Sequence, residues 1–249
     1  MDIERYQEFL TNLPNRKEYT KSDLLVPDLL FAEEGKLRVF YAPFESVNEN
    51  AKVVFLGITP GWKQMEIACR EARTILSSGG SAEDACRMVK SKASFAGPLR
   101  TNLVKMLDAI NLPHLLGTQS SSDLFDKDRA LLHSTSVIRY PVFNGTKNYT
   151  GNNPRLVKSQ FLMRFVKQIL APELESIPNA VIVPLGKSAE EVLTFLEGEK
   201  RIRSEYWLKG FPHPSGANGH RVRQFIENRE KLTLQLKNIL GKSNSASQE

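Results

Sequence analysis

One histidine of the chain lies in a context that favours chemistry over packing. His213 stands between Pro212 and Pro214, and the two prolines fix the backbone on either side of it. Ser215 or Asn218 can cap the basic helix that is expected to follow. A rigid loop that ends at such a helix directs an imidazole and backbone N–H groups toward an anion or a phosphodiester. A lone histidine is more often structural, but this setting predicts a functional role for His213.

Three further stretches carry residues that could form a site. Gly57–Gly61 (GITPG) follows an apolar run, and glycines that flank a proline after a buried strand make a tight loop that a ligand can approach closely. Phe95 precedes a helix, where its ring could stack on a base or pack in the core. Tyr140–Asn153 is a polar loop rich in Asn and Gly. Gly186–Ser188 resembles the end of a phosphate-binding P-loop, but the glycine required five residues earlier is absent, so we assign no such motif.

The elements that must position these stretches alternate between strands and helices. Apolar runs predict buried strands at 52–57, 134–140, 180–185 and 208–211, with a further strand at 37–41. Amphipathic patterns predict helices at 3–13, 62–76, 82–92, 99–110, 155–170, 187–195 and 219–240. This alternation predicts an α/β fold: a single-domain sandwich with a mainly parallel, four-stranded central sheet and helices on both faces. Sites in such sheets lie at the carboxyl ends of the strands, so the stretches should converge on one crevice.

The chain is expected to have three parts that differ in composition. Residues 1–45 are predicted to form an N-terminal helical extension, residues 46–240 the α/β domain, and residues 241–249 a disordered polar tail. Residues 1–50 hold 6 basic and 10 acidic side chains. Residues 129–172 hold 7 basic side chains and no Asp or Glu, which favours a surface for phosphates.

The composition excludes several classes of protein. The chain has 249 residues, of which 41% are hydrophobic and 25% charged, as in ordinary globular proteins. It has no apolar run long enough to span a membrane and no signal peptide, so we expect a cytoplasmic or nuclear protein. Two cysteines argue against a disulfide scaffold and a cysteine-based zinc site. We expect DNA, and not a membrane, as the partner of the protein. The net charge of +6 gives mild support to a nucleic-acid partner. We also expect a monomer that uses neither a metal nor another cofactor.

Two motifs, taken together and in this order, resemble the uracil-DNA glycosylase superfamily. Gly57–Gly61 is similar to the G-x-x-P-G motif after its first strand, and His213-Pro-Ser-x-x-Asn218 is similar to the HPS-type loop after its last strand. Phe95–Gly97 resembles the loop whose aromatic ring stacks on the extruded base, and Thr135–Pro141 resembles the central strand and its basic exit. The first motif is nearest to the mismatch-specific and single-strand-selective branches. The resemblance implies a DNA glycosylase that flips and excises uracil or a related deaminated base.

The resemblance also implies a role for each candidate residue. His213 and Thr59 are the expected catalytic residues, because His213 would stabilise the departing base and Thr59 would position the attacking water. The expected substrate-binding residues are Gly57, Ile58, Pro60, Gly61, Phe95 and Ser136. The expected DNA-binding residues are Lys147, Ser215, Asn218 and Arg221.

Two positions depart from the pattern of the superfamily. Thr59 stands where some branches have Asn, and a hydroxyl is a poor base near neutral pH. Ser136 stands where an Asn often reads the uracil edge. Two cysteines cannot provide the four-cysteine iron–sulfur cluster of some branches. A catalytically weak or inactive protein that binds DNA or a damaged base is therefore an alternative, as are an enzyme acting on free nucleosides or nucleotides and a structural or regulatory domain.

Overall fold

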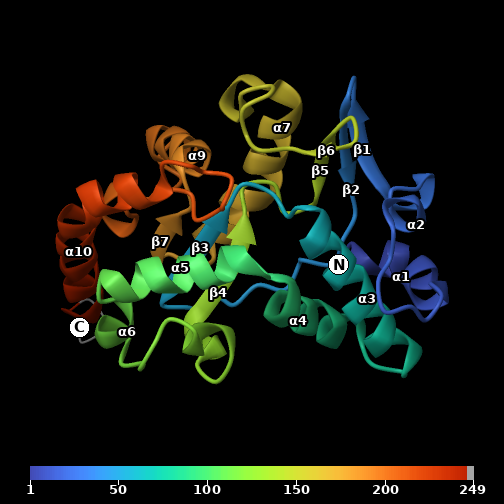
Figure 1. Ribbon diagram of the computed structural model, residues 1–249, viewed down its shortest axis with the longest axis horizontal. Helices are drawn as coiled ribbons and strands as arrows, with labels where there is room; N and C mark the ends of the chain where they lie inside the picture. The colour runs from blue at the N-terminus through green and yellow to red at the C-terminus, as the bar shows by residue number, and fades with distance from the viewer. Residues whose placement is uncertain (246–249) are drawn as a thin grey trace.

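The computed structural model describes residues 1–245, which form two sheets surrounded by helices (Figure 1). The strands are β1 (Leu30–Glu34), β2 (Leu37–Phe40), β3 (Val53–Gly57), β4 (Leu132–Ser136), β5 (Val142–Asn144), β6 (Lys147–Asn148) and β7 (Val181–Pro184). The helices are α1 (Ile3–Asn12), α2 (Lys21–Leu24), α3 (Trp62–Ser77), α4 (Ala82–Ala93), α5 (Pro98–Ala109), α6 (Leu112–Leu116), α7 (Gln160–Phe165), α8 (Ala171–Glu175), α9 (Lys187–Gly198) and α10 (Arg221–Ser245). The predicted α/β class is confirmed.

The parallel sheet has the strand order β4-β3-β7 and lies at the centre of the molecule (Figure 1). Side chains of β3 alternate between its two faces, as the period of a strand requires. Val54 and Leu56 belong to a core shared with α3, α4, α7 and α9, whereas Val53 and Phe55 belong to a second core shared with α5, α6 and α10. Both faces of the sheet are therefore covered by helices, which explains the unbroken apolar run of this strand.

The predicted four-stranded parallel sheet is wrong, because the parallel sheet has three strands. The segment 208–211 lies beside β7, but it pairs there only through an isolated bridge between Ile182 and Trp207 and a hydrogen bond from Leu208 N to Ile182 O. Gly210 then takes a left-handed backbone with φ +92°, and Pro212 lacks the N–H that a ladder needs. The apolar character of the segment reflects its burial and not a strand.

The antiparallel sheet has the order β1-β2-β5-β6 and combines the start of the chain with its middle. In its register Leu37 pairs with Asn144 and Val39 pairs with Val142. The N-terminal segment was expected to be a helical extension, but it is helical only in part, since it supplies two of these strands. The strand β2 pairs with β5, which lies more than 100 residues further along the chain, and a local pattern does not reveal such a partner.

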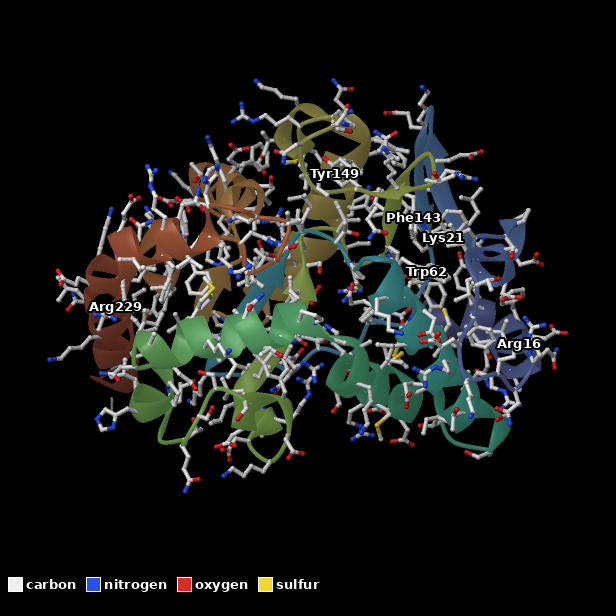
Figure 2. The ribbon with its side chains drawn as sticks, in the orientation of Figure 1. Arg16, Lys21, Trp62, Phe143, Tyr149 and Arg229 are labelled. Carbon is white, nitrogen blue, oxygen red and sulfur yellow. The ribbon has the colours of Figure 1, made fainter. Side chains whose placement is uncertain are left out.

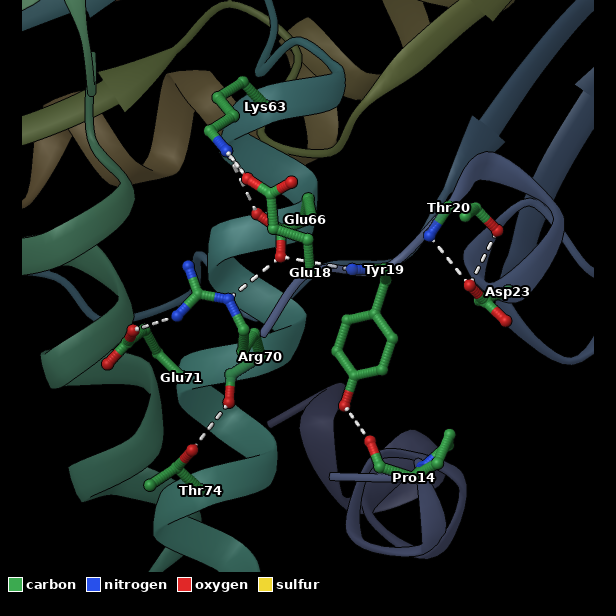
Figure 3. Close-up of polar contacts among 10 residues, drawn as sticks. All are labelled: Pro14, Glu18, Tyr19, Thr20, Asp23, Lys63, Glu66, Arg70, Glu71 and Thr74. Atoms are coloured by element: carbon green, nitrogen blue, oxygen red, sulfur yellow. Dashed lines mark hydrogen bonds and ion pairs between the residues drawn. The ribbon is translucent and has the colours of Figure 1, made fainter. Parts of the chain in front are cut away.

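The N-terminal segment is fastened to α3 by a buried carboxylate (Figure 3). Glu66 on α3 accepts hydrogen bonds at Oε1 from Arg70 Nε at 2.9 Å and from the backbone N–H of Tyr19 at 3.4 Å. Lys63 lies 3.6 Å from the other carboxylate oxygen and also pairs with Glu18 at 2.9 Å. These contacts hold the residues between α1 and α2 against the body of the protein.

The two ends of the molecule are formed by the two ends of the chain. Arg16 and Lys21 lie at one end, and Arg229 on α10 lies at the opposite end (Figure 2). The predicted terminal helix extends to Ser245, and residues 246–249 of the predicted disordered tail lie outside the described residues. Within residues 1–245, no helix has both the length and the apolarity needed to cross a membrane.

Candidate functional site

A pocket of about 670 Å³ opens at the carboxyl ends of β3, β4 and β7, where the predicted crevice lies. The segments that line it lie far apart in the sequence. They are Gly57–Gly61, 94–95, 134–136, 148–150, 186–188 and several residues of 213–218. Every predicted site residue contributes to its lining except Lys147 and Arg221. The structure thus brings together most of the residues that the sequence singled out.

His213 presents a defined neutral tautomer to this pocket. Its Nδ1 accepts a hydrogen bond from the backbone N–H of Ser215 at 3.1 Å, so the proton of the neutral ring is carried by Nε2. Burial lowers the pKa of His213 to about 4. At neutral pH the ring is therefore an uncharged hydrogen-bond donor in the pocket wall.

The loop that carries His213 rests on a glycine at the end of β7. Gly186 has φ +91°, and its backbone N–H donates to Phe211 O at 3.1 Å. A Cβ atom at this position would lie 2.7 Å from His213 Cβ. Glycine is needed here both for the left-handed backbone and for the close approach of the loop. The Gly186–Ser188 segment, which the sequence analysis set aside as a false P-loop, thus supports the histidine and lines the pocket.

Phe95, Gly57 and Ser136 meet at the inner wall. A Cβ atom at Gly57 would lie 3.0 Å from Phe95 Cε1 and 3.2 Å from Ser136 Oγ, so the glycine makes room for the ring. Phe95 is 8% exposed and has φ +54°, a conformation that is uncommon for a residue with a side chain. Arg100 holds the preceding turn through a hydrogen bond from Nε to Ser94 O at 3.1 Å. The ring both packs in the core and lines the pocket, so the two alternatives considered for it are compatible.

The hydroxyl of Thr59 is engaged by the backbone. Its Oγ1 donates to Tyr140 O at 2.8 Å and accepts from the N–H of Val142 at 3.1 Å. These bonds tie the loop after β3 to the segment that leads into β5. Thr59 lies in the lining, as the sequence analysis expected, but the structure gives its hydroxyl a positioning role in the fold.

Three of the four residues expected to bind DNA organise the His213 loop instead of projecting from it. Ser215 Oγ accepts from Ala217 N at 3.1 Å, and Asn218 Nδ2 donates to His213 O at 3.3 Å. Arg221 reaches back and donates to Ser215 O at 2.7 Å. Lys147 is exposed on β6, next to Asn148, whose side chain lines the pocket. Of these four residues, Lys147 is therefore the one that lies outside the His213 loop.

The segment without carboxylates, 129–172, is not a uniform basic surface. Arg139, Arg155 and Lys167 form ion pairs with carboxylates of other segments, at 2.7 Å, 2.7 Å and 3.0 Å respectively. Within the described residues, no carboxylate forms an ion pair with Lys147 or Lys158. The positive charge available to a ligand is accordingly smaller than the sequence count indicates.

A buried ionic cluster lies at the inner end of the pocket. Glu173 accepts from His133 Nε2 and from Arg139 through its two oxygens, each at 2.7 Å, and lies 3.8 Å from Lys90 Nζ. Asn48 N donates to His133 Nδ1, which places the ring proton on Nε2. Burial alone would raise the pKa of Glu173, but Lys90, His133 and Arg139 hold it well below its usual range. Burial lowers the pKa of His133 to about 4 and that of Lys90 to about 8.

Two cations of this cluster, Lys90 and Arg139, also line the pocket, together with Lys187. None of the described residues in the lining is Asp or Glu. A pocket with this charge attracts acceptor-rich or anionic ligands. None of these lining residues has a carboxylate that could act as a base in a reaction.

Sequence reasoning missed Lys90 because the residue was counted only as part of a helix. A signal was present: Lys90 follows Cys86 by four residues and precedes Ala93 by three, which places it on the apolar face of α4. A lysine on such a face needs a buried partner. That partner, Glu173, is the first carboxylate after the acid-free segment, and the fold alone brings it to α4.

The fold and the site define an α/β protein whose pocket, at the carboxyl ends of three parallel strands, is positively charged and holds a neutral histidine. No family model matches the chain. The uncharacterized protein YoxB of Bacillus subtilis (strain 168) is 40% identical to it over 239 residues, which cover 95% of this chain and 93% of that protein. The chain belongs to the same family as YoxB.

Proposed function

We propose that the protein is a DNA glycosylase that extrudes uracil or a related deaminated base and hydrolyses its N-glycosidic bond. The observation that carries the proposal is the convergence of four separate segments, Gly57–Gly61, Phe95, Ser136 and His213–Asn218, on one pocket. These are the segments that resemble the glycosylase motifs, and they occur there in the order that the resemblance requires.

In the proposed reaction the C1′–N bond breaks and its electron pair goes to the departing base. His213 Nε2–H would donate to a carbonyl oxygen of the base as negative charge grows there, which is stabilisation by a preorganised donor. Phe95 would hold the flipped base by stacking, worth about 1–3 kcal/mol. Water would bond to C1′, and its proton would end on the base. Because the Thr59 hydroxyl is occupied and the carbonyls of Gly57, Ile58 and Gly61 accept backbone N–H groups, the carbonyl oxygen of Thr59 would hold this water.

The test is incubation of the protein with single- and double-stranded oligonucleotides that contain one uracil, followed by alkali to cleave abasic sites. We expect cleavage at the uracil position and none in the matching thymine oligonucleotide. An absence of base release from uracil and hypoxanthine in both kinds of DNA would contradict the proposal.

A second candidate is a glycosylase-like protein that binds an extruded base without excising it. It is favoured by the absence of carboxylates among the described lining residues and by the engaged hydroxyl of Thr59. Tighter binding of uracil-containing than of thymine-containing DNA, with no abasic product, would support it.

A further inference from the structure

The amine of Lys90 reaches the inner end of the pocket from α4. Nζ donates to the carbonyl oxygen of Ser134 at 2.7 Å and lies 3.8 Å from Glu173 Oε1. The residue is 3% exposed, yet it lines the pocket. An ammonium group has three protons, so these two neighbours leave one proton for a ligand.

A neighbouring hydroxyl is also left for a ligand. Thr135 on β4 is 6% exposed and lines the pocket, and its Oγ1 has no hydrogen-bond partner within the described residues. Arg139 Nε is buried without such a partner as well. A buried polar group that makes no hydrogen bond costs free energy, so native proteins rarely keep one without a use. Two such atoms, on residues that line the same pocket as the buried amine, indicate a built binding site.

The groups at this inner end differ in chemistry from the Asn side-chain amide that often reads the uracil edge in the superfamily. Lys90 can only donate hydrogen bonds, whereas the Thr135 hydroxyl can donate or accept. Glu173 does not line the pocket, and its two oxygens are held by His133 and Arg139. The edge that meets Lys90 must therefore carry an acceptor.

We propose that Lys90 and Thr135 read the edge of the extruded base that faces away from the sugar, and that they select a base with a carbonyl oxygen there over one with an amino group. The inference rests on the proposed function, in which the base enters this pocket. A carbonyl oxygen accepts from the ammonium of Lys90, and a ring N–H can donate to Thr135 Oγ1. An amino group would place its protons against those of Lys90 and leave the third ammonium proton without an acceptor.

The experiment measures binding of free bases by ligand-observed NMR or calorimetry, which needs neither DNA nor catalysis. We expect uracil and hypoxanthine to bind more tightly than cytosine and adenine. Lys90→Met should weaken uracil binding by about 10- to 100-fold, the scale of a hydrogen bond to a charged group. Thr135→Val should also weaken it while leaving the melting temperature unchanged or higher, because Oγ1 has no partner to lose. Thr194→Val, at an exposed position of α9 outside the pocket lining, is the control and should bind uracil like the parent.

The Thr135→Val variant keeps the test decisive if Lys90→Met fails to fold. Unchanged uracil binding by Thr135→Val would overturn the inference, as would equal binding of uracil and cytosine by the parent. Inorganic phosphate that displaced uracil at equal concentration would overturn it too, because the site would then be a general anion site. Uracil binding that depends on Thr135, with no excision from DNA, would overturn the proposed enzymatic function alone. Excision that both variants leave unchanged would overturn the inference alone.

Discussion

Gly186 and His213 are packed so closely that a Cβ atom on the glycine would lie 2.7 Å from the Cβ atom of the histidine. The glycine ends the turn after β7, and the histidine belongs to the loop that closes the pocket. The position of the imidazole therefore depends on the absence of a side chain 27 residues earlier in the chain.

Gly186→Ala tests this dependence. Gly186 has φ +91° and ψ 171°, a region that is essentially restricted to glycine and costs another residue about 1–3 kcal/mol, and the clash with His213 should add about 1–3 kcal/mol. Gly97→Ala is the matched control, since Gly97 has a similar backbone, with φ +85° and ψ −152°, and nothing within 4 Å of an added Cβ. Urea denaturation should show a larger loss of unfolding free energy for Gly186→Ala. Equal losses would mean that the loop yields without strain.

His213→Ala should lower the rate of base excision by about 10²–10³-fold, the scale for removal of one preorganised donor. DNA binding should change little. His114→Ala, at an exposed position on α6, serves as the control. Full activity of His213→Ala would assign the histidine to loop structure alone.

The stability of the protein should fall on the acid side of neutrality. His213 and His133 have folded-state pKa values of about 4, below the value of about 6.5 expected for an unfolded chain. The unfolded chain then binds more protons between these values, so the free energy of unfolding decreases as the pH falls from about 6.5 to 4. Glu173, whose pKa is depressed, adds a further loss as the pH falls below about 4.5. Urea titrations at several pH values measure this dependence. His213→Gln should reduce the slope of unfolding free energy against pH near pH 6.5. An unfolding free energy that stays constant between pH 6.5 and 4 would contradict the prediction.

Thr59→Val should destabilise the protein by about 1–3 kcal/mol, because Tyr140 O and the N–H of Val142 lose their partner. Thr59→Ser keeps the hydroxyl and should retain most of the stability and of any excision activity. Thermal melts together with the oligonucleotide assay distinguish the two variants. If Thr59→Val were as stable as the parent but inactive, the hydroxyl would act on the substrate and not on the fold.

Lys147→Ala should reduce the salt dependence of duplex binding by about 0.9 in the slope of log K against log salt, as expected for one lost phosphate contact. The control is Lys167→Ala from the same acid-free segment, where the amine pairs with Glu199 at 3.0 Å. Fluorescence anisotropy at several salt concentrations gives both slopes. Equal effects of the two substitutions would show that Lys147 does not make the expected contact with a DNA phosphate.

The sequence predicted the elements whose patterns are local. α3, α4 and α5 begin and end within a few residues of their predicted bounds, because each has an amphipathic period and is preceded by Gly or Ser. It failed at 208–211, where apolar residues indicated a strand but a left-handed Gly210 and two prolines prevent a ladder.

The candidate site was predicted where it depends on loops that follow strands, and missed where it depends on packing between distant elements. Gly57–Gly61 and His213 could be found because glycine and proline mark the ends of buried segments. Lys90 could not be paired with Glu173, since 82 residues separate them and no local pattern relates α4 to α8.

The hydrogen bond from the hydroxyl of Tyr140 to Asp2, together with the pairing of β2 with β5, has a consequence for biosynthesis. Translation delivers Asp2 and β2 before their partners, which leave the ribosome only after more than 100 further residues have been made. Until then the nascent hairpin of β1 and β2 exposes an unpaired edge, the kind of surface that associates with other chains. Folding must therefore wait for contacts of long sequence separation, which are slow to form. Chaperones that act during synthesis should therefore bind mainly to the segment that contains the hairpin of β1 and β2.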